Sequence, residues 1–205
     1  MTHTVDENTI ASSPGQIEIS KIKFFDYIEL MGIKRIKYNI LFSLPSNFLY
    51  KLFSSDEIVY DYIQKQEQFK FGCLNPTIVI NKEKGLIATF TNLTSIGDEI
   101  TPVVKISKEP LGLIKSIKVV NGQKLPTVAL YTRNTEDEFA TAWTDFTPKV
   151  ANCFTDDLTI CNELLSRLSS NSWKCLDLGL AQVYDKEQEG LYYVKLQKDL
   201  VQSSY

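Results

Sequence analysis

The stretch IKSIKVVNGQKLPTVALYTR, residues 114–133, decides the fold that we expect. Apolar and β-branched residues dominate both sides of Asn121-Gly122. An Asn-Gly pair readily adopts the positive φ angles of a tight type I′ turn. The pattern therefore predicts strands over 114–120 and 125–133, joined as an antiparallel hairpin.

Further strand-like segments lie on both sides of this hairpin along the chain. Each is short, rich in β-branched or apolar residues and bounded by turn residues, and they span 77–81, 86–93, 102–107 and 139–144. Six short antiparallel strands at this spacing predict a strongly curved sheet or a small open barrel. Two more strands are predicted near the C-terminus, over 173–183 and 191–196.

Helical spacing of apolar residues dominates the chain before the sheet. It predicts helical stretches over 20–53. A Ser-x-x-Glu capping box at 54–57 then predicts a helix over 55–68. A further helix is predicted near 156–169, where Thr155 is the expected N-cap and acidic residues follow it.

These elements predict an α+β chain in which an N-terminal helical segment packs on an antiparallel, strongly curved sheet or small open barrel. Residues 1–19 are polar and are expected to form a disordered tail. The helical segment spans 20–71 and the β-rich part spans 76–205. The whole of 20–205 can form one compact unit, because its length suits a single domain.

Composition excludes several classes of protein. The 205 residues carry a net charge of −3, and a pI near 5.3 argues against duplex nucleic acid as a partner. The sequence contains no apolar run of the roughly 18 residues that a transmembrane helix needs. The first 20 residues lack Lys and Arg, so they do not resemble a secretory signal. The expected location is the cytoplasm.

Histidine and cysteine usage argue against most enzymatic and metal-binding chemistry. His3 is the single histidine, so we expect neither imidazole-based catalysis nor a zinc site. The four cysteines have no CxxC spacing and are expected to be free thiols in a reducing compartment. Cys153 precedes a predicted helix, but without a histidine base it is expected to be structural. No glycine-rich phosphate loop or EF-hand loop is present, so we expect no cofactor, no metal and no catalytic residue.

One constellation suits ligand binding. Trp143 and Asp145 stand two residues apart before Pro148, and Tyr131 and Arg133 have the same spacing on the preceding predicted strand. Residues at i and i+2 of a strand share one face. Arg133 is therefore expected to reach Asp145, with Tyr131 and Trp143 as the aromatic walls of a ligand or peptide site. The alternative is a packed corner in which Trp143 belongs to the core.

Charge is distributed unevenly. Residues 20–53 carry six Lys or Arg against two acidic residues, whereas residues 133–163 are strongly acidic. We expect a non-catalytic binding or protein-interaction module, with a protein partner or a homodimer. One alternative is a hydrolase or transferase that uses Asp145 with Arg133. A second alternative is a peripheral protein that binds an anionic membrane surface through the basic helices.

Overall fold

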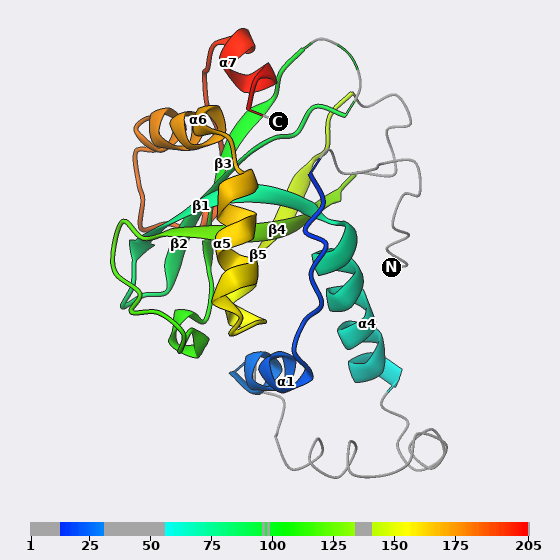
Figure 1. The fold of residues 1–205 in the computed structure, drawn as a ribbon. Coiled ribbons are helices and arrows are strands. Elements are labelled where there is room, and N and C mark those ends of the chain that lie inside the picture. The colour runs from blue at the N-terminus through cyan, green and yellow to red at the C-terminus, as the bar shows by residue number, and fades with distance from the viewer. Residues whose placement is uncertain (1–12, 31–55, 96, 98, 134–140, 205) are drawn as a thin grey trace.

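The computed structural model describes residues 13–30, 56–95, 97, 99–133 and 141–204. Within these residues the chain forms a six-stranded antiparallel sheet that is strongly curled, with helices packed around it (Figure 1). This confirms the predicted α+β class with an antiparallel, strongly curved sheet. Across the sheet the strands are β5 (Asp145–Val150), β4 (Lys124–Thr132), β1 (Cys73–Asn81), β2 (Leu86–Asn92), β3 (Pro102–Lys108) and β6 (Gly190–Tyr193).

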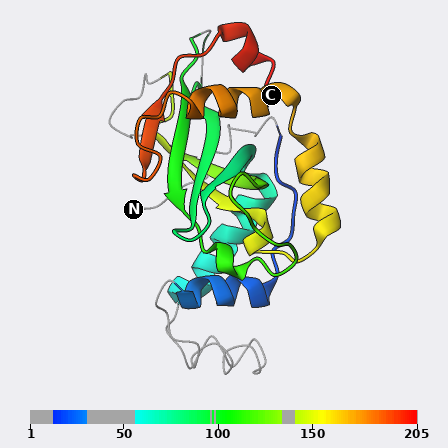
Figure 2. The same ribbon diagram turned by 90° about the vertical axis from the view of Figure 1, so that its left-hand side faces the viewer.

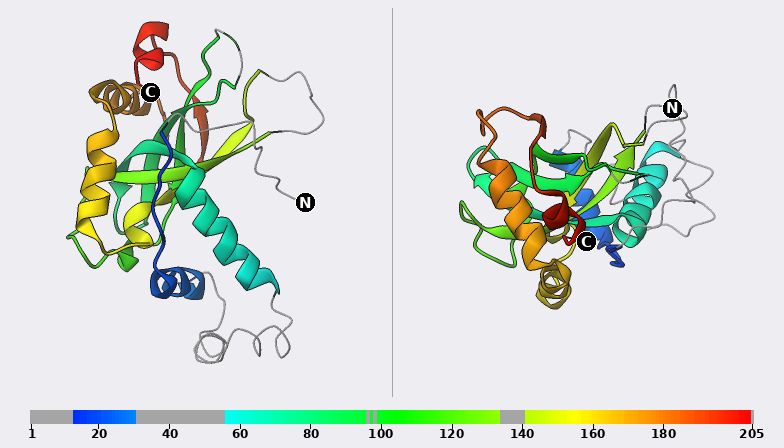
Figure 3. Two further views of the ribbon diagram at one scale, coloured as in Figure 1. Left: turned by 45° about the vertical axis from the view of Figure 1, so that its right-hand side comes forward. Right: turned by 90° about the horizontal axis from the view of Figure 1, so that it is seen from above.

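The helices cover the sheet from two sides (Figure 2). Helices α4 and α5 pack against β4, whereas α6 packs against β1, β2 and β3 and also contacts α7 (Figure 3). Apolar side chains fill both contacts, with Phe69 and Leu164 on one side and Leu176 on the other. The described helices are α1 (Lys21–Leu30), α4 (Asp56–Phe71), α5 (Leu158–Arg167), α6 (Ser170–Leu180) and α7 (Lys198–Gln202), with short 3-10 turns η1 (Leu111–Leu113) and η2 (Ala151–Cys153).

Three buried threonines form a hydroxyl chain across the middle of the sheet. Thr77 on β1 lies opposite Thr89 on β2, and the two hydroxyls are 2.7 Å apart. The Thr77 hydroxyl also contacts that of Thr127 on β4 at 2.8 Å, and Thr127 donates to the Asn75 carbonyl at 3.1 Å. Since each hydroxyl has a partner, these polar groups are buried without the cost of an unmade hydrogen bond.

The predicted hairpin around Asn121-Gly122 is wrong in its partner strand. Gly122 adopts a φ of +81° but Asn121 does not adopt a positive φ, so the turn is tight but not of the predicted type I′. The Gly122 N–H donates to the Val79 carbonyl at 2.8 Å. Residues 114–120 do not form a strand; they follow η1 as irregular chain and bury Ile114 and Val119 in the core. The segment after the turn, β4, pairs with β1 and β5 instead.

The strand predicted over 173–183 is also wrong, because this segment forms helix α6. The Ser169 hydroxyl caps the helix by accepting from the Ser172 N–H at 3.0 Å. Apolar residues at 176, 178 and 180 alternate like a strand, yet Leu176 is fully buried whereas Leu178 is 43% exposed. The predicted strand over 139–144 is displaced, since β5 begins at Asp145; residues 139 and 140 lie outside the described residues.

The other predicted helices are confirmed within the described residues. Helices α1, α4 and α5 lie where the apolar spacing predicts them, although Asp157 rather than Thr155 caps α5. The helical stretches predicted over 33–53 lie outside the described residues. The expected disordered tail is corrected at its last residues: Ile17 and Ile19 are buried, and the Ile17 N–H donates to the Phe69 carbonyl.

Candidate functional site

The candidate site residues meet beside the junction of β4 and β5, and we call Tyr131, Arg133, Trp143 and Asp145 the edge group. Tyr131 lies opposite Phe146 in the β4–β5 ladder, and Asp145 lies opposite Thr132. Trp143 precedes β5, and its N–H donates to the Leu93 carbonyl at 2.7 Å. The backbone therefore fixes all four residues at one place in the fold.

Aromatic contacts organise the edge group. The ring centroids of Tyr131 and Trp143 are 5.9 Å apart, and the Arg133 guanidinium lies 5.4 Å from the Trp143 ring centroid. Arg133 Nη2 donates to the Ser95 hydroxyl at 3.0 Å, and the Tyr131 hydroxyl contacts that of Thr91 at 2.5 Å. The Arg133 guanidinium thus lies over the Trp143 ring, and the Tyr131 ring is tilted against Trp143 at an interplanar angle of 48°. All three side chains are partly exposed.

Asp145 forms its ion pair with Lys105 of β3, a residue that the sequence did not single out. Lys105 Nζ lies 2.8 Å from each carboxylate oxygen of Asp145 and donates to the Phe146 carbonyl at 2.6 Å. The carboxylate also accepts the Phe146 N–H at 2.8 Å. The Asp145 side chain is nevertheless 47% exposed. The Asp145 carboxylate thus links β5 to β3 through its ion pair with Lys105.

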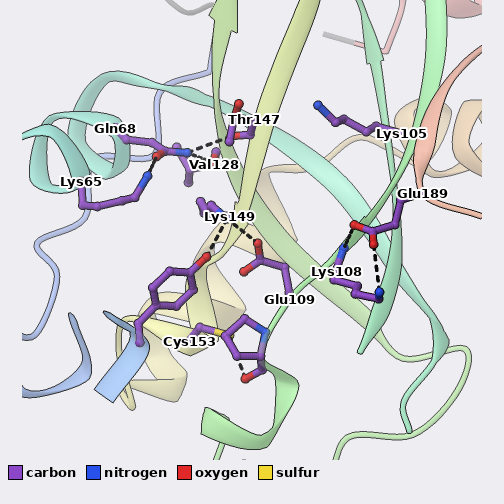
Figure 4. Close-up of polar contacts among 12 residues, drawn as sticks. Lys65, Gln68, Lys105, Lys108, Glu109, Val128, Thr147, Lys149, Cys153 and Glu189 are labelled. Atoms are coloured by element: carbon purple, nitrogen blue, oxygen red, sulfur yellow. Dashed lines mark hydrogen bonds and ion pairs between the residues drawn. The ribbon is translucent and has the colours of Figure 1, made fainter. Parts of the chain in front are cut away.

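A second polar cluster lies inside the molecule, and we call Tyr27, Lys65, Gln68, Glu109 and Lys149 the buried network. Lys149 of β5 pairs with Glu109, which follows β3, at 2.7 Å (Figure 4). Lys149 Nζ also donates to the hydroxyl of Tyr27 on α1 at 2.6 Å. The Glu109 side chain is only 1% exposed. These contacts join α1 to the sheet through a desolvated ion pair.

Burial perturbs the titration of this network. It raises the pKa of Glu109, and the nearby ammonium of Lys149 opposes the shift. Burial likewise raises the pKa of Tyr27 to about 12, with a further contribution from Glu109. For Lys149 burial favours the neutral form, but Glu109 and Tyr27 outweigh it and raise its pKa. Lys149 is therefore a charged residue at neutral pH.

Gln68 and Lys65 connect helix α4 to the same network. Gln68 Nε2 donates to the Val128 and Thr147 carbonyls, both at 2.9 Å, and its Oε1 accepts from Lys65 Nζ at 3.0 Å. Gln68 is 1% exposed, so its amide is held in one orientation. Burial, followed by the charge of Lys149, lowers the pKa of Lys65 to about 8.

The chain matches a family model over residues 62–184, described as "Protein of unknown function (DUF3239)". This match covers more than half of the sequence. The chain belongs to the DUF3239 family. The matched range includes the whole edge group as well as Lys65, Glu109 and Lys149.

One solved structure is distantly similar to this DUF3239 chain. It is described as "Crystal structure of a putative membrane protein from Corynebacterium diphtheriae". The two sequences are 17% identical, the TM-score is 0.46, and the match covers 59% of this chain and 99% of that one. No curated protein matches the chain in sequence.

The basic face predicted over 20–53 is corrected at Lys23. This residue of the DUF3239 chain is buried: its Nζ pairs with Asp156 at 2.6 Å and donates to the Leu113 carbonyl at 2.9 Å. On the described helix α1, Lys21 is then the one exposed lysine, and Asp26 and Glu29 lie on the same helix. The contact with Asp156 joins the basic and the acidic segments of the sequence inside one molecule.

All four cysteines of the chain are free, as predicted. Burial raises the pKa of Cys153 well above its ordinary value, and it raises the pKa of Cys161 to about 11. Cys153 is fully buried, so it lacks both the exposure and the thiolate character of a nucleophile. The side chains that the structure describes contain no cluster of three or more His, Cys, Asp or Glu suited to a metal ion.

Helix length and polarity bear on membrane insertion. Among the helices built from described residues, none has both the length and the apolar character needed to cross a bilayer.

Proposed function

We propose that this chain is a non-catalytic binding module that receives a carboxylate-bearing peptide segment of a partner protein at the edge group. The observation that supports this most is the position of the Arg133 guanidinium over the Trp143 ring, beside Tyr131. An aromatic face attracts a guanidinium, and the planar guanidinium carries its N–H donors in a fork that matches carboxylates.

The aromatic rings suit the rest of such a ligand. Trp and Tyr supply large contact areas at low cost in conformational entropy, and both are enriched where proteins bind other proteins. Trp143 and Tyr131 are partly exposed, and they are held by backbone and hydroxyl hydrogen bonds. A peptide that binds here therefore meets side chains that are already in position.

The environment of Asp145 favours binding over hydrolysis. A carboxyl that acts as a general acid or base needs a desolvated position that adjusts its proton affinity to the reaction. Asp145 is instead nearly half exposed and bonded to both Lys105 and the Phe146 N–H. This arrangement supports a role in fixing β5 beside β3, so we do not propose carboxylate catalysis.

The position of Lys23 gives little support to membrane-surface binding. Attraction to anionic lipid depends on several exposed lysines or arginines on one helix face. Lys23 binds Asp156 and the Leu113 carbonyl, which leaves Lys21 as the one exposed lysine of the described helix α1. The internal Lys23–Asp156 pair likewise weakens the argument for a homodimer led by charge.

A fluorescence titration tests the proposed site. The chain has two tryptophans, so in a Trp173→Phe background the emission reports Trp143 alone. The probes are three sets of amidated 12-residue peptides that are rich in Glu, in Gln or in Lys. We expect the Glu-rich peptides to change Trp143 emission and to bind more weakly as salt concentration rises.

Two variants assign the binding to Arg133. Arg133→Gln is expected to weaken binding of the Glu-rich peptides about tenfold, or about 1.4 kcal/mol. Lys108→Gln removes one positive charge from an exposed β3 residue and is expected to leave binding unchanged. The proposal is contradicted if no peptide set alters Trp143 emission, or if the two variants lose affinity equally.

A further inference from the structure

Strand β6 forms one end of the sheet, and its neighbour β3 lies on one side of it only (Figure 2, orange-red strand at the left). The Val194 N–H donates to the Pro102 carbonyl at 3.1 Å, so Val194 points its backbone groups toward β3. Backbone groups alternate in direction along an antiparallel strand. Leu191 and Tyr193 therefore point their N–H and C=O groups away from β3, toward the outer edge.

The next residue of this outward set shows what the outer edge can bind. The Lys195 N–H donates to Gln182 Oε1 at 2.8 Å, and the Lys195 carbonyl accepts from Gln182 Nε2 at 3.0 Å. The Gln182 amide thus occupies the place where a further strand would pair. Outside the β3–β6 ladder, no hydrogen bond between residues that the structure describes uses the backbone of Leu191 or Tyr193. An added strand therefore finds its hydrogen-bonding groups at these two residues.

The outer edge of β6 borders the same apolar cluster as the edge group. Tyr193 lies opposite Val103 in the ladder, and residues directly opposite one another point to the same face of a sheet. Val103 is fully buried in an apolar cluster. Leu191 and the edge-group rings of Tyr131 and Trp143 pack against that same cluster. A strand paired with β6 therefore directs every second side chain toward the face that carries the edge group.

We propose that the carboxylate-bearing peptide binds as an extended strand paired with the outer edge of β6, an inference that rests on the proposed function. Its residues opposite Leu191 and Tyr193 exchange backbone hydrogen bonds with them. The side chains of these same residues face the edge group, and one of them supplies the carboxylate for Arg133. Lys195 is exposed and adds positive charge at the end of the paired stretch. The partner segment is thus extended, with acidic residues at alternate positions.

N-methylated peptides test the backbone pairing in the full chain. The probe is an amidated 12-residue peptide in which Glu and Thr alternate, and Trp143 emission reports its binding in the Trp173→Phe background. In the proposed geometry the Glu N–H groups donate to β6, whereas the Thr N–H groups point away from it. We expect N-methylation of the central Glu residues to weaken binding about tenfold, and N-methylation of the central Thr residues to change it less than about twofold.

Two substitutions at one exposed position test the same hydrogen bonds from the side of the protein. Tyr193→Pro removes an N–H that points away from β3, and edge strands tolerate proline at such positions. Tyr193→Ala, the matched control, also removes the phenol, which is 68% exposed, but keeps the N–H. We expect the unmethylated peptide to bind Tyr193→Pro about fivefold more weakly than Tyr193→Ala. Thermal unfolding before the titration confirms that both variants are folded.

The outcomes separate this inference from the proposed function. Strand pairing is overturned if the two N-methylated peptides bind equally, or if methylation of Thr weakens binding more than methylation of Glu. Either result, together with binding that still depends on Arg133, would leave the proposed function intact. Equal affinity of the folded Tyr193→Pro and Tyr193→Ala variants would also contradict pairing with β6. A Trp143 emission that responds to none of these peptides would remove the proposed function and this inference together.

Discussion

Asp145 of the edge group and Glu109 of the buried network each form an ion pair with a lysine. The two pairs are nearly equal in length but lie in very different surroundings. Lys105–Asp145 and Lys149–Glu109 are 2.8 and 2.7 Å long, yet the acidic side chains are 47% and 1% exposed. Water solvates Asp145 when its partner is lost, but it does not reach Glu109. The exposed pair can therefore change with little effect on the fold, whereas removing one partner of the buried pair leaves the other as an uncompensated buried charge.

The largest expected effect breaks the buried pair. Glu109→Ala leaves the Lys149 ammonium in a desolvated site, and we expect the free energy of unfolding to fall by about 3–5 kcal/mol. Urea denaturation at pH 7 measures this change. Glu189→Ala, which removes the partner of the exposed Lys108, is the matched control and should cost less than about 1 kcal/mol. Equal losses in the two variants would show that the network is not the desolvated structure described above.

A smaller effect is expected from the hydroxyl chain in the sheet. Thr77→Val keeps the shape of the side chain but leaves the hydroxyls of Thr89 and Thr127 each without one partner. We expect a loss of about 2 kcal/mol in the free energy of unfolding. Thr147→Val, at an exposed position of β5, serves as the control and should have little effect. A neutral Thr77→Val variant would contradict a structural role for the chain of hydroxyls.

Lys65 offers a pH-dependent test of the buried network. Its pKa falls from 10.5 to about 8 on folding, so the unfolded chain binds more protons between these values and stability contributed by this group rises with pH there. Below pH 8 the folded protein bears the full cost of the charge. We expect Lys65→Met to raise the free energy of unfolding by about 1 kcal/mol at pH 7, a gain that shrinks as pH approaches 10. A gain that does not depend on pH would contradict this account.

The smallest effect concerns the exposed pair. Asp145→Asn leaves the bond from Lys105 to the Phe146 carbonyl in place, and we expect a loss of only about 0.5 kcal/mol. Added salt should shrink the difference further, because the pair is open to solvent. Thermal unfolding at low and high ionic strength measures it. A loss as large as that of Glu109→Ala would remove the distinction between the two clusters.

Local patterns in the sequence predict much of the sheet but not its pairing. Runs of β-branched and apolar residues correctly place β2, β3 and β4, and the positive φ of Gly122 confirms a turn there, although not one of type I′. A turn sets where the chain reverses, but it does not determine which strand lies beside β4. That choice depends on β1, some 50 residues earlier, and no local pattern encodes it.

Helix α6 shows that a local pattern can also predict the wrong type of secondary structure. Its apolar residues alternate over 176–180, yet the alternation does not follow burial, since Leu178 is exposed. The cap at Ser169 and the close approach of Gly179 to β3, where an added Cβ would lie 2.8 Å from Val104 Cγ2, are the features that fit a helix here.

The sequence predicts the candidate site only for residues that lie close together along the β4–β5 pairing. The spacing of Tyr131 and Trp143 on adjacent segments predicts that their rings lie together, and the structure places them in contact. Lys105 was missed because the curl of the sheet brings β3 to β5, which are not adjacent strands. The buried network was missed for the same reason: Tyr27, Glu109 and Lys149 meet only through tertiary packing.

Peptide affinity in two variants tests most directly whether binding depends on the edge group and not on the buried network. In the Trp173→Phe background, Glu109→Gln alters the buried network and Arg133→Gln alters the edge group. We predict that Glu-rich peptides bind the folded Glu109→Gln variant as tightly as the parent chain, and bind Arg133→Gln about tenfold more weakly. Tight binding by Arg133→Gln together with lost binding by folded Glu109→Gln would contradict this assignment.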